Sequence, residues 1–168
     1  MTAPIYKVLG RFVRDLLPYP ESLIKFGRQN FERADLETNY IVIDSLTGDI
    51  PLTSSEGYDG EAEQMTYSEY VSRLFTFDFY GAGAFENCRK FRLLCRSQAS
   101  LELQETLGIT VWHPGSATDL KQLTGQQYGE RMQLECQVHY NQSEVVDILR
   151  IDTAQLRIIG ERGLIYEQ

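Results

Sequence analysis

Few residues in this chain have both the type and the spacing that catalysis requires. The two histidines stand apart, because His113 precedes Pro114 in a predicted turn and His139 lies on the polar face of a predicted strand. No serine occurs in a G-x-S-x-G segment, so the nucleophile elbow of hydrolases is absent. The chain also lacks the pattern G-x-x-x-x-G-K-[ST], and the turn at residues 81–83 lacks the third glycine of a dinucleotide site. These residues predict a protein that is not an enzyme and has no cofactor.

The cysteines and the acidic clusters are the remaining groups that could bind a metal. Cys88 and Cys95 lie seven residues apart on the apolar face of a predicted helix, and no C-x-x-C pair occurs. We therefore expect buried thiols in a protein of a reducing compartment. Asp44 and Asp49 flank a turn, and residues 58–63 are rich in carboxylates, but neither segment has the spacing of a calcium loop. Solvated carboxylates, without a bound metal, are the expected state.

The charge of the chain is unevenly distributed. The net charge is -8, yet no Lys or Arg occurs between Ala34 and Ser72. That interval holds only acidic charges: Asp35, Glu37, Asp44, Asp49, Glu56, Asp59, Glu61, Glu63 and Glu69. Basic residues gather on one face of each of two predicted helices: Lys7, Arg11 and Arg14 on the first, and Arg89, Arg92 and Arg96 on the second. Each charged run is either a solvated surface or one side of a contact between copies. The acidic balance disfavours nucleic-acid recognition, which needs a positive field.

A strand, a glycine turn and a helix form the centre of the predicted fold. In the strand at 71–79, Phe75, Phe77 and Phe79 share one face because side chains alternate with period 2. Residues 81–83 break the strand. An apolar stripe at helical spacing follows, made of Ala84, Phe85, Cys88, Phe91, Leu94, Cys95 and Ala99. The simplest packing places this stripe on the phenylalanine face.

The other predicted elements complete an α+β fold, with an antiparallel or mixed sheet and helices on one face. We expect a single domain over 1–168. It begins with an N-terminal helix at 1–17, which Thr2 can cap. The apolar stripe of this helix has helical spacing and consists of Ile5, Val8, Leu9, Phe12, Val13, Leu16 and Leu17. Strands at 23–26 and 40–46 and a mobile β-excursion at 47–66 follow. After the central helix, residues 101–107 either extend it or form a second short helix that Gly108 ends, and a strand follows at 109–112. The rest of the chain is a loop at 116–125 with a helical turn at 119–123, a strand at 130–140, and a C-terminal extension at 142–168 with β-like runs at 145–151 and 156–159. No run approaches the roughly 20 apolar residues of a membrane span, so we expect no membrane partner.

A succession of short strings resembles the phage neck and tail terminator family. These strings are Phe77-Asp78-Phe79-Tyr80-Gly81 with Ala84, then Arg96-Ser97, then residues 125–131, and a strand ending at 138–141. The resemblance covers about 30–141. It implies a structural virion protein, located in the tail or neck and assembled in the host cytoplasm. Such a protein forms a ring, typically hexameric, that caps the tail tube, joins it to the head-side connector and lets DNA pass without sequence-specific binding.

The charge pattern suggests how copies of such a ring would meet. Our hypothesis is that the acidic excursion, 49–69, contacts one of the two basic faces of the next subunit, since a closed ring requires two complementary flanks. A rival hypothesis places the excursion in the lumen, where acidic residues keep DNA from adhering. Two other functions stay open: a minor tail or baseplate adaptor, and a small-ligand binder with a pocket around Trp112, His113 and Tyr128.

Overall fold

The protein is described from a computed structural model, which divides into two compact units. We call residues 1–54 and 69–142 the body, and residues 55–68 and 143–168 the second unit. The backbone is described for 4–27, 38–112, 114–120, 122–124, 127–148, 158–159 and 165–166, and side chains for 4–27, 38–112, 114–120 and 129–148. The domain boundaries expected from the sequence stay a prediction.

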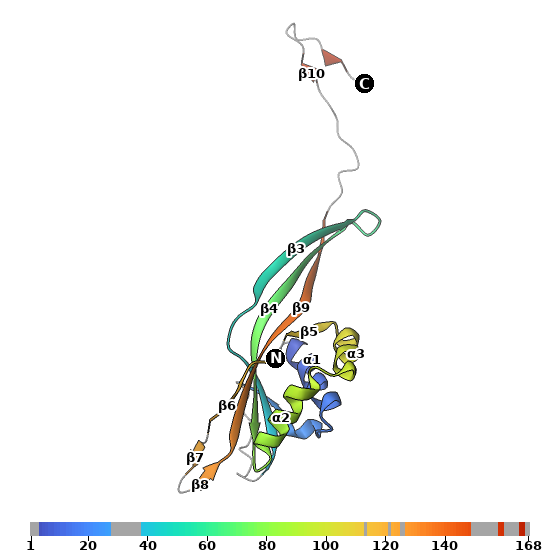
Figure 1. Cartoon of the computed structure of the whole chain (residues 1–168). Coiled ribbons are helices and arrows are strands. Elements are labelled where there is room, and N and C mark those ends of the chain that lie inside the picture. Colours follow the sequence, from blue (N-terminus) through green and yellow to red (C-terminus); the bar gives the residue numbers. More distant parts are fainter. Residues whose placement is uncertain are drawn as a thin grey trace. The chain divides into compact units, whose positions relative to one another are not determined.

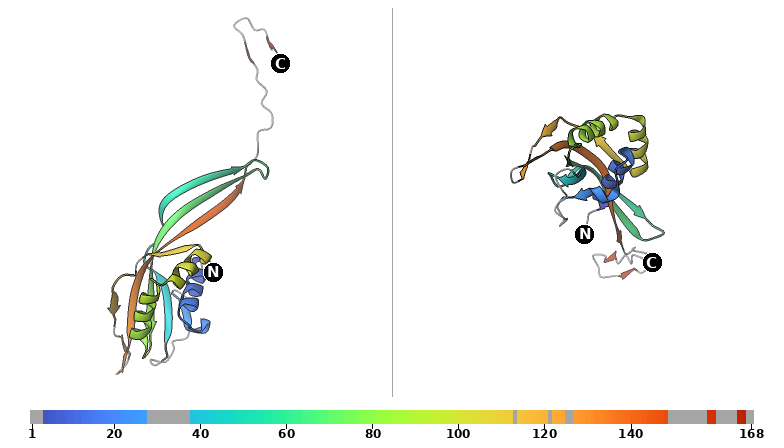
Figure 2. Two further views of the ribbon diagram at one scale, coloured as in Figure 1. Left: turned by 45° about the vertical axis from the view of Figure 1, so that its right-hand side comes forward. Right: turned by 90° about the horizontal axis from the view of Figure 1, so that it is seen from below.

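The described body contains three α-helices that pack on one face of its sheet (Figures 1 and 2). They are α1 (Pro4–Leu16), α2 (Ala84–Leu94) and α3 (Gln98–Leu107), and a short 3-10 turn, η1 (Glu21–Leu23), follows α1. The apolar stripe of α1 is buried, as the sequence predicts, with Leu9, Phe12 and Val13 fully enclosed. Thr2, expected to cap this helix, lies outside the described residues.

The sheet has seven strands and is mixed. Its central order is β1 (Ile24–Phe26), β2 (Tyr40–Ser45), β4 (Gln64–Tyr80), β9 (Arg131–Asp147) and β5 (Ile109–Trp112), with β3 (Ile50–Asp59) on β4 and β6 (Ala117–Asp119) on β9. Strand β1 is parallel to β2, whereas β2 is antiparallel to β4, and β5 and β6 are antiparallel to β9. This arrangement confirms the predicted α+β class with its mixed sheet.

The phenylalanine face of β4 is the centre of the core, as expected from the alternation. Phe75, Phe77 and Phe79 are buried, and their neighbours across the pairing with β2 are Ser45, Ile43 and Ile41. The Phe91 ring of α2 lies 5.1 Å from the Phe77 ring and 5.7 Å from the Phe79 ring, between centroids. Strand β9 adds a second set of buried side chains to this core: Met132, Leu134, Cys136, Val138 and Tyr140. The predicted packing of the helix stripe on this strand face is therefore confirmed.

The turn between β4 and α2 requires glycine at its first position. Gly81 has φ +94°, and a Cβ there would lie 2.5 Å from the carbonyl oxygen of Thr38. Larger residues are excluded both by this conformation and by the close approach of the backbone. The next glycine, Gly83, donates its N–H to Asn39 Oδ1 at 2.7 Å, which joins the turn to the residue before β2.

The residues after Gly83 form two helices, which is one of the two alternatives that the sequence left open. Helix α2 ends at Leu94, and α3 begins after Ser97, whose side chain accepts a hydrogen bond from the N–H of Ser100 at 3.2 Å. Gly108 ends α3 in the left-handed conformation, as predicted. Within the predicted apolar stripe, Ala84, Cys88, Phe91 and Cys95 are buried, whereas Phe85 and Ala99 are exposed. The prediction that these last two belong to the inward face was wrong.

The segment after β5 also differs from the prediction. Instead of a loop with a helical turn at 119–123, it contains β6 and a small two-stranded sheet of β7 (Gln122–Thr124) and β8 (Gln127–Gly129). Strand β6 forms because Ala117 and Asp119 pair with Leu134 and Met132 of β9, a long-range template that local propensity does not reveal. Strand β9 runs on to Asp147, so the start of the expected extension at 142–168 continues a core strand. The later run contains β10 (Ile158–Ile159), which pairs with β11 (Ile165–Tyr166).

Candidate functional site

The thiols of the body are buried and have low nucleophilic reactivity. Cys88, Cys95 and Cys136 are free and buried, as the sequence predicts. Burial raises the pKa of Cys88 to about 11 and that of Cys95 to about 12, so their reactive thiolate forms are scarce near neutral pH. In the described part of the chain, no three His, Cys, Asp or Glu side chains gather as a metal site would need.

One histidine lies in an aromatic cluster on the sheet face opposite the helices. The His139 ring stacks on the Trp112 ring at 5.9 Å and meets the Tyr70 ring edge-on at 5.8 Å, between centroids. Its Nε2 atom is buried and has no hydrogen-bond partner among the described residues. His113 and the side chain of Tyr128, which would complete the predicted ligand pocket, lie outside the described residues. That pocket therefore stays a prediction.

The basic face of α1 is largely neutralised within its own chain. Arg14 Nε lies 2.7 Å from Asp15 Oδ1, and Arg14 also reaches Glu21 at 3.6 Å. Arg11 Nε lies 3.5 Å from Oδ2 of the same Asp15, which follows Arg11 by one helical turn. The hydrogen bond from Arg14, with the charges of both arginines, lowers the pKa of Asp15 and keeps it ionised. Only Lys7 of the three predicted residues has no ion-pair partner among the described side chains.

The basic face of α2 is less neutralised. Arg89 makes a two-pronged contact with Glu86, at 2.6 and 3.1 Å. Arg92 and Arg96 are exposed and have no acidic partner within the described residues. Residues 84–97 carry four basic side chains and one acidic side chain, Glu86. The outer face of α2 therefore keeps a net positive charge that a partner can neutralise.

The six acidic residues of the predicted excursion, 49–69, separate into two groups. Two of them, Asp49 and Glu69, lie in the body and are engaged there: Asp49 binds Arg73, and Glu69 accepts a hydrogen bond from Gln142 at 3.1 Å. The other four, Glu56, Asp59, Glu61 and Glu63, lie in the second unit. Asp59 Oδ1 accepts hydrogen bonds from the N–H groups of Glu61 and Ala62, at 2.9 and 3.1 Å, and so closes the turn after β3. Glu56, Glu61 and Glu63 are exposed.

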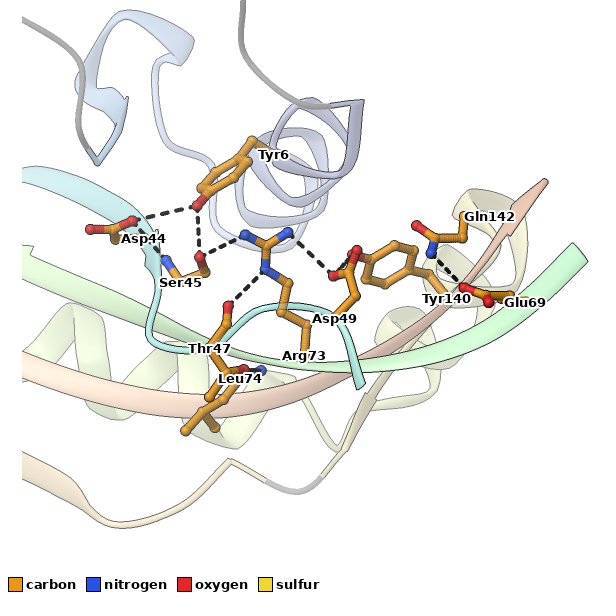
Figure 3. A network of polar contacts seen from close by, with 10 residues as sticks. All are labelled: Tyr6, Asp44, Ser45, Thr47, Asp49, Glu69, Arg73, Leu74, Tyr140 and Gln142. Carbon is orange, nitrogen blue, oxygen red and sulfur yellow. Dashed lines mark hydrogen bonds and ion pairs between the residues drawn. The ribbon is translucent and has the colours of Figure 1, made fainter. Parts of the chain in front are cut away.

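A polar network that the sequence analysis did not identify surrounds Arg73 (Figure 3). Its guanidinium donates to Ser45 Oγ at 2.9 Å, to the Thr47 carbonyl at 3.2 Å and to Asp49 Oδ1 at 3.3 Å. The hydroxyl of Tyr140 donates to the same Asp49 oxygen at 2.6 Å. These bonds fix the chain between β2 and β3 against β4 and β9. Burial first, and then the bond to Asp49, raise the pKa of Tyr140 to about 12.

One sequence signal could have located this network. Arg73 interrupts the otherwise apolar set of odd residues in the predicted strand. A charge at such a position needs a partner when the face is buried, so it predicts a carboxylate nearby. The identity of that carboxylate could not be predicted, because Asp49 and Tyr140 come to it through strand pairing.

A second ionic contact lies on the opposite face of the sheet. Asp78 is buried, and its Oδ1 accepts hydrogen bonds from Arg131 Nε and Gln133 Nε2, both at 3.2 Å. Burial raises the pKa of Asp78, and the Arg131 charge opposes that rise. The predicted polar face of β9 thus includes side chains, Arg131 and Gln133, that bind Asp78 of the neighbouring strand β4.

The second unit has no core of its own in the part that the structure describes. None of its described side chains is buried, and the part of β3 that belongs to it, residues 55–59, is exposed throughout. Its described residues, 55–68 and 143–148, carry six acidic side chains and no Lys or Arg. It also exposes large apolar side chains: Tyr58, Tyr67, Val145 and Val146. A sheet with no buried face is marginally stable alone, so these strands are suited to contact with another surface.

These features define an α+β protein whose described surfaces suit assembly. A comparison with protein families matches residues 3–162 to the phage neck terminator proteins. The chain therefore belongs to that family and is a structural component of the phage virion, located at the neck and in contact with other head or tail proteins. No curated protein matches the chain. Among the described residues, none of the helices has the length and apolar character to span a bilayer.

Proposed function

We propose that the protein is the tail terminator of its phage. Six copies form a ring that caps the tail tube and binds the head-side connector, and the genome passes through the lumen without sequence-specific contact. The ring forms in the host cytoplasm and has no catalytic role, cofactor or membrane partner. Family membership over residues 3–162 supports the neck location.

The separation of charge within one small chain is the observation that carries ring formation. The described second unit is acidic throughout, whereas the outer face of α2 is basic. Identical subunits with two different complementary surfaces associate head to tail, and such contacts close into a ring when the rotation between copies allows it.

The decisive experiment measures the mass of the purified protein in solution and images it with tail tubes that lack a terminator. We expect closed rings, free or at the tube ends. The double charge reversal Arg92→Glu with Arg96→Glu should weaken the ring, and so should added salt, because exposed ion pairs are screened. A protein that stays monomeric with and without tubes would contradict the proposal.

The free carboxylates at the turn of the second unit favour one rival arrangement, in which they line the lumen. Glu61 and Glu63 are exposed, and the structure shows no ion pair for either among the described residues. In a lumen they would repel DNA phosphates and ease passage. The substitutions Glu61→Gln and Glu63→Gln separate the two arrangements: they weaken ring assembly if the contact is between subunits, and they slow genome exit without affecting assembly if the residues face DNA.

A further inference from the structure

Helix α2 exposes apolar side chains among its arginines. Phe85 is 61% exposed and Leu93 is 56% exposed, although both belong to a helix whose other face is fully buried. The two residues are eight positions apart, with Arg89 halfway between them, so they lie along one side of the helix. Arg92 and Arg96 flank Leu93 on that side. We call these five residues, Phe85, Arg89, Arg92, Leu93 and Arg96, the α2 stripe.

This mixture of groups limits what kind of partner fits the stripe. Two large apolar side chains on one exposed helix face, beside basic residues that lack acidic partners, are typical of an interaction surface. A nucleic acid would satisfy the charges, but its phosphates offer nothing to cover Phe85 and Leu93. The matching surface must be acidic and also carry exposed apolar side chains.

The second unit of another copy has both properties. Its described residues include six acidic side chains, and Tyr58 and Val145 are 52% and 55% exposed. The α1 face is a poorer match, because Arg11 and Arg14 are already paired with Asp15 and Glu21. We infer that the α2 stripe receives the second unit of a neighbouring copy, with Phe85 and Leu93 as apolar anchors. This inference rests on the proposed ring and identifies which of the two basic faces forms its contact.

An amphipathic contact behaves differently from a purely ionic one. Apolar anchors at the centre of a contact supply most of the affinity, whereas exposed charges supply rate and specificity. The substitution Leu93→Ser should therefore raise the protein concentration needed for half-assembly by about tenfold or more. A salt concentration of about 1 M, at which charges are screened beyond a few ångströms, should weaken the wild-type ring less than this single substitution does.

The chain offers a matched control for this test. Leu101 on α3 is 55% exposed, close to the exposure of Leu93, but its neighbours include the acidic Glu102 and Glu105. The variant Leu101→Ser removes the same apolar group from a surface that would repel an acidic partner. We expect it to assemble like the wild type. Thermal unfolding of both variants shows whether either substitution disturbs the fold.

Site-directed cross-linking tests the contact itself. The natural cysteines are buried, so an introduced surface cysteine reacts with little background. Protein with Leu93→Cys is mixed in equal amounts with protein carrying Tyr58→Cys or Val145→Cys, incubated with terminator-free tail tubes and treated with a short bismaleimide. We expect a cross-linked dimer of two different variants in at least one mixture. The corresponding mixtures with Leu101→Cys should give none.

The outcomes distinguish this inference from the proposed ring. If rings form but neither Leu93→Cys mixture cross-links, or if Leu101→Cys cross-links equally well, the α2 stripe is not the contact and the inference is wrong. In that case the terminator function still stands. If no oligomer forms in solution or on tubes, both the inference and the proposed function fail.

Discussion

The body and the described part of the second unit differ in how much side-chain surface they bury. The body buries phenylalanines, aliphatic residues and thiols between three helices and one face of a sheet, and it secures its buried charges with partners. The described part of the second unit buries nothing and exposes acids, tyrosines and valines. The two units share the backbone of long strands but differ in what those strands contact. Strand formation alone therefore does not reveal whether a segment stabilises a fold or presents a surface.

The largest expected effect contrasts one aromatic residue from each unit. Phe91 is fully buried against Phe77 and Phe79, so Phe91→Ala should lower the free energy of unfolding by about 3–5 kcal/mol. Tyr58 is exposed, so Tyr58→Ala should change it by less than about 0.5 kcal/mol. Urea unfolding of the isolated protein measures both values. Similar losses for the two variants would mean that the second unit has a core that the described residues do not show.

The next prediction compares a body network with a surface ion pair. Arg73→Met leaves Asp49 with one fewer donor and removes three hydrogen bonds, so we expect a loss of about 1–3 kcal/mol. Arg89→Met breaks an exposed pair within α2, and the free energy of unfolding should scarcely change. Chemical unfolding with both variants at the same salt concentration tests this order. An equal effect would show that the Arg73 network is no more stabilising than a solvated pair.

A smaller effect concerns alkaline pH. The pKa of Tyr140 is raised to about 12 because the phenol is buried and bonded to Asp49. Its stabilising contribution is complete below the unfolded-state pKa near 10 and is lost as the pH rises from there through about 12. Between pH 8 and pH 11, Tyr140→Phe should therefore lose less unfolding free energy than the wild type, by up to about 1.4 kcal/mol.

Burial also raises the pKa of Tyr19 to about 12, and Cys88 and Cys95 ionise in the same range, so the variant still loses stability there. Unfolding curves at both pH values give the comparison. If the wild type and Tyr140→Phe lose the same amount, the Tyr140 hydroxyl is solvated and the bond to Asp49 contributes little.

The smallest expected effect lies in the second unit. Glu63 has φ +53°, the only positive value among the described non-glycine residues, and its carbonyl accepts a hydrogen bond from the N–H of Ile148 at 2.8 Å. Glycine adopts this conformation without strain, so Glu63→Gly should stabilise the turn and the hydrogen bond from Ile148. Hydrogen exchange at the Ile148 amide should therefore slow a few-fold. The control Glu61→Gly adds freedom at a position with no such strain and should speed the same exchange. The opposite order would exclude backbone strain as the factor that limits this turn.

Local patterns account for most of the elements that were predicted correctly. The period-2 phenylalanines identified β4, the period-3.6 stripe identified α1, and Gly81 and Gly108 identified a turn and a helix end. One error in the elements occurred where a distant strand determined the outcome. Residues 117–119 form β6 because β9 supplies its hydrogen-bond partners.

The candidate surfaces were predicted as a set of charges, and the structure separates that set. Asp49 and Glu69 are used within the body, and Arg11 and Arg14 pair with carboxylates of their own segment. Within the described residues, Arg92, Arg96, Glu56, Glu61 and Glu63 are exposed and have no ion-pair partner. Phe85 was assigned to the wrong face, because a helical stripe shows which residues align but not how wide the buried zone is.

The amino-acid sequence by itself determined the α+β class, the inward faces of the main strand and first helix, the buried thiols and the separation of acidic from basic segments. These properties follow from alternation, helical period and composition, all of which are local. Only the tertiary structure decided which charges are already paired and which apolar side chains remain exposed. The reason is that an ion pair such as Arg73 with Asp49, or a bond such as Tyr140 with Asp49, joins residues 24 and 91 positions apart, which only the strand pairing brings together.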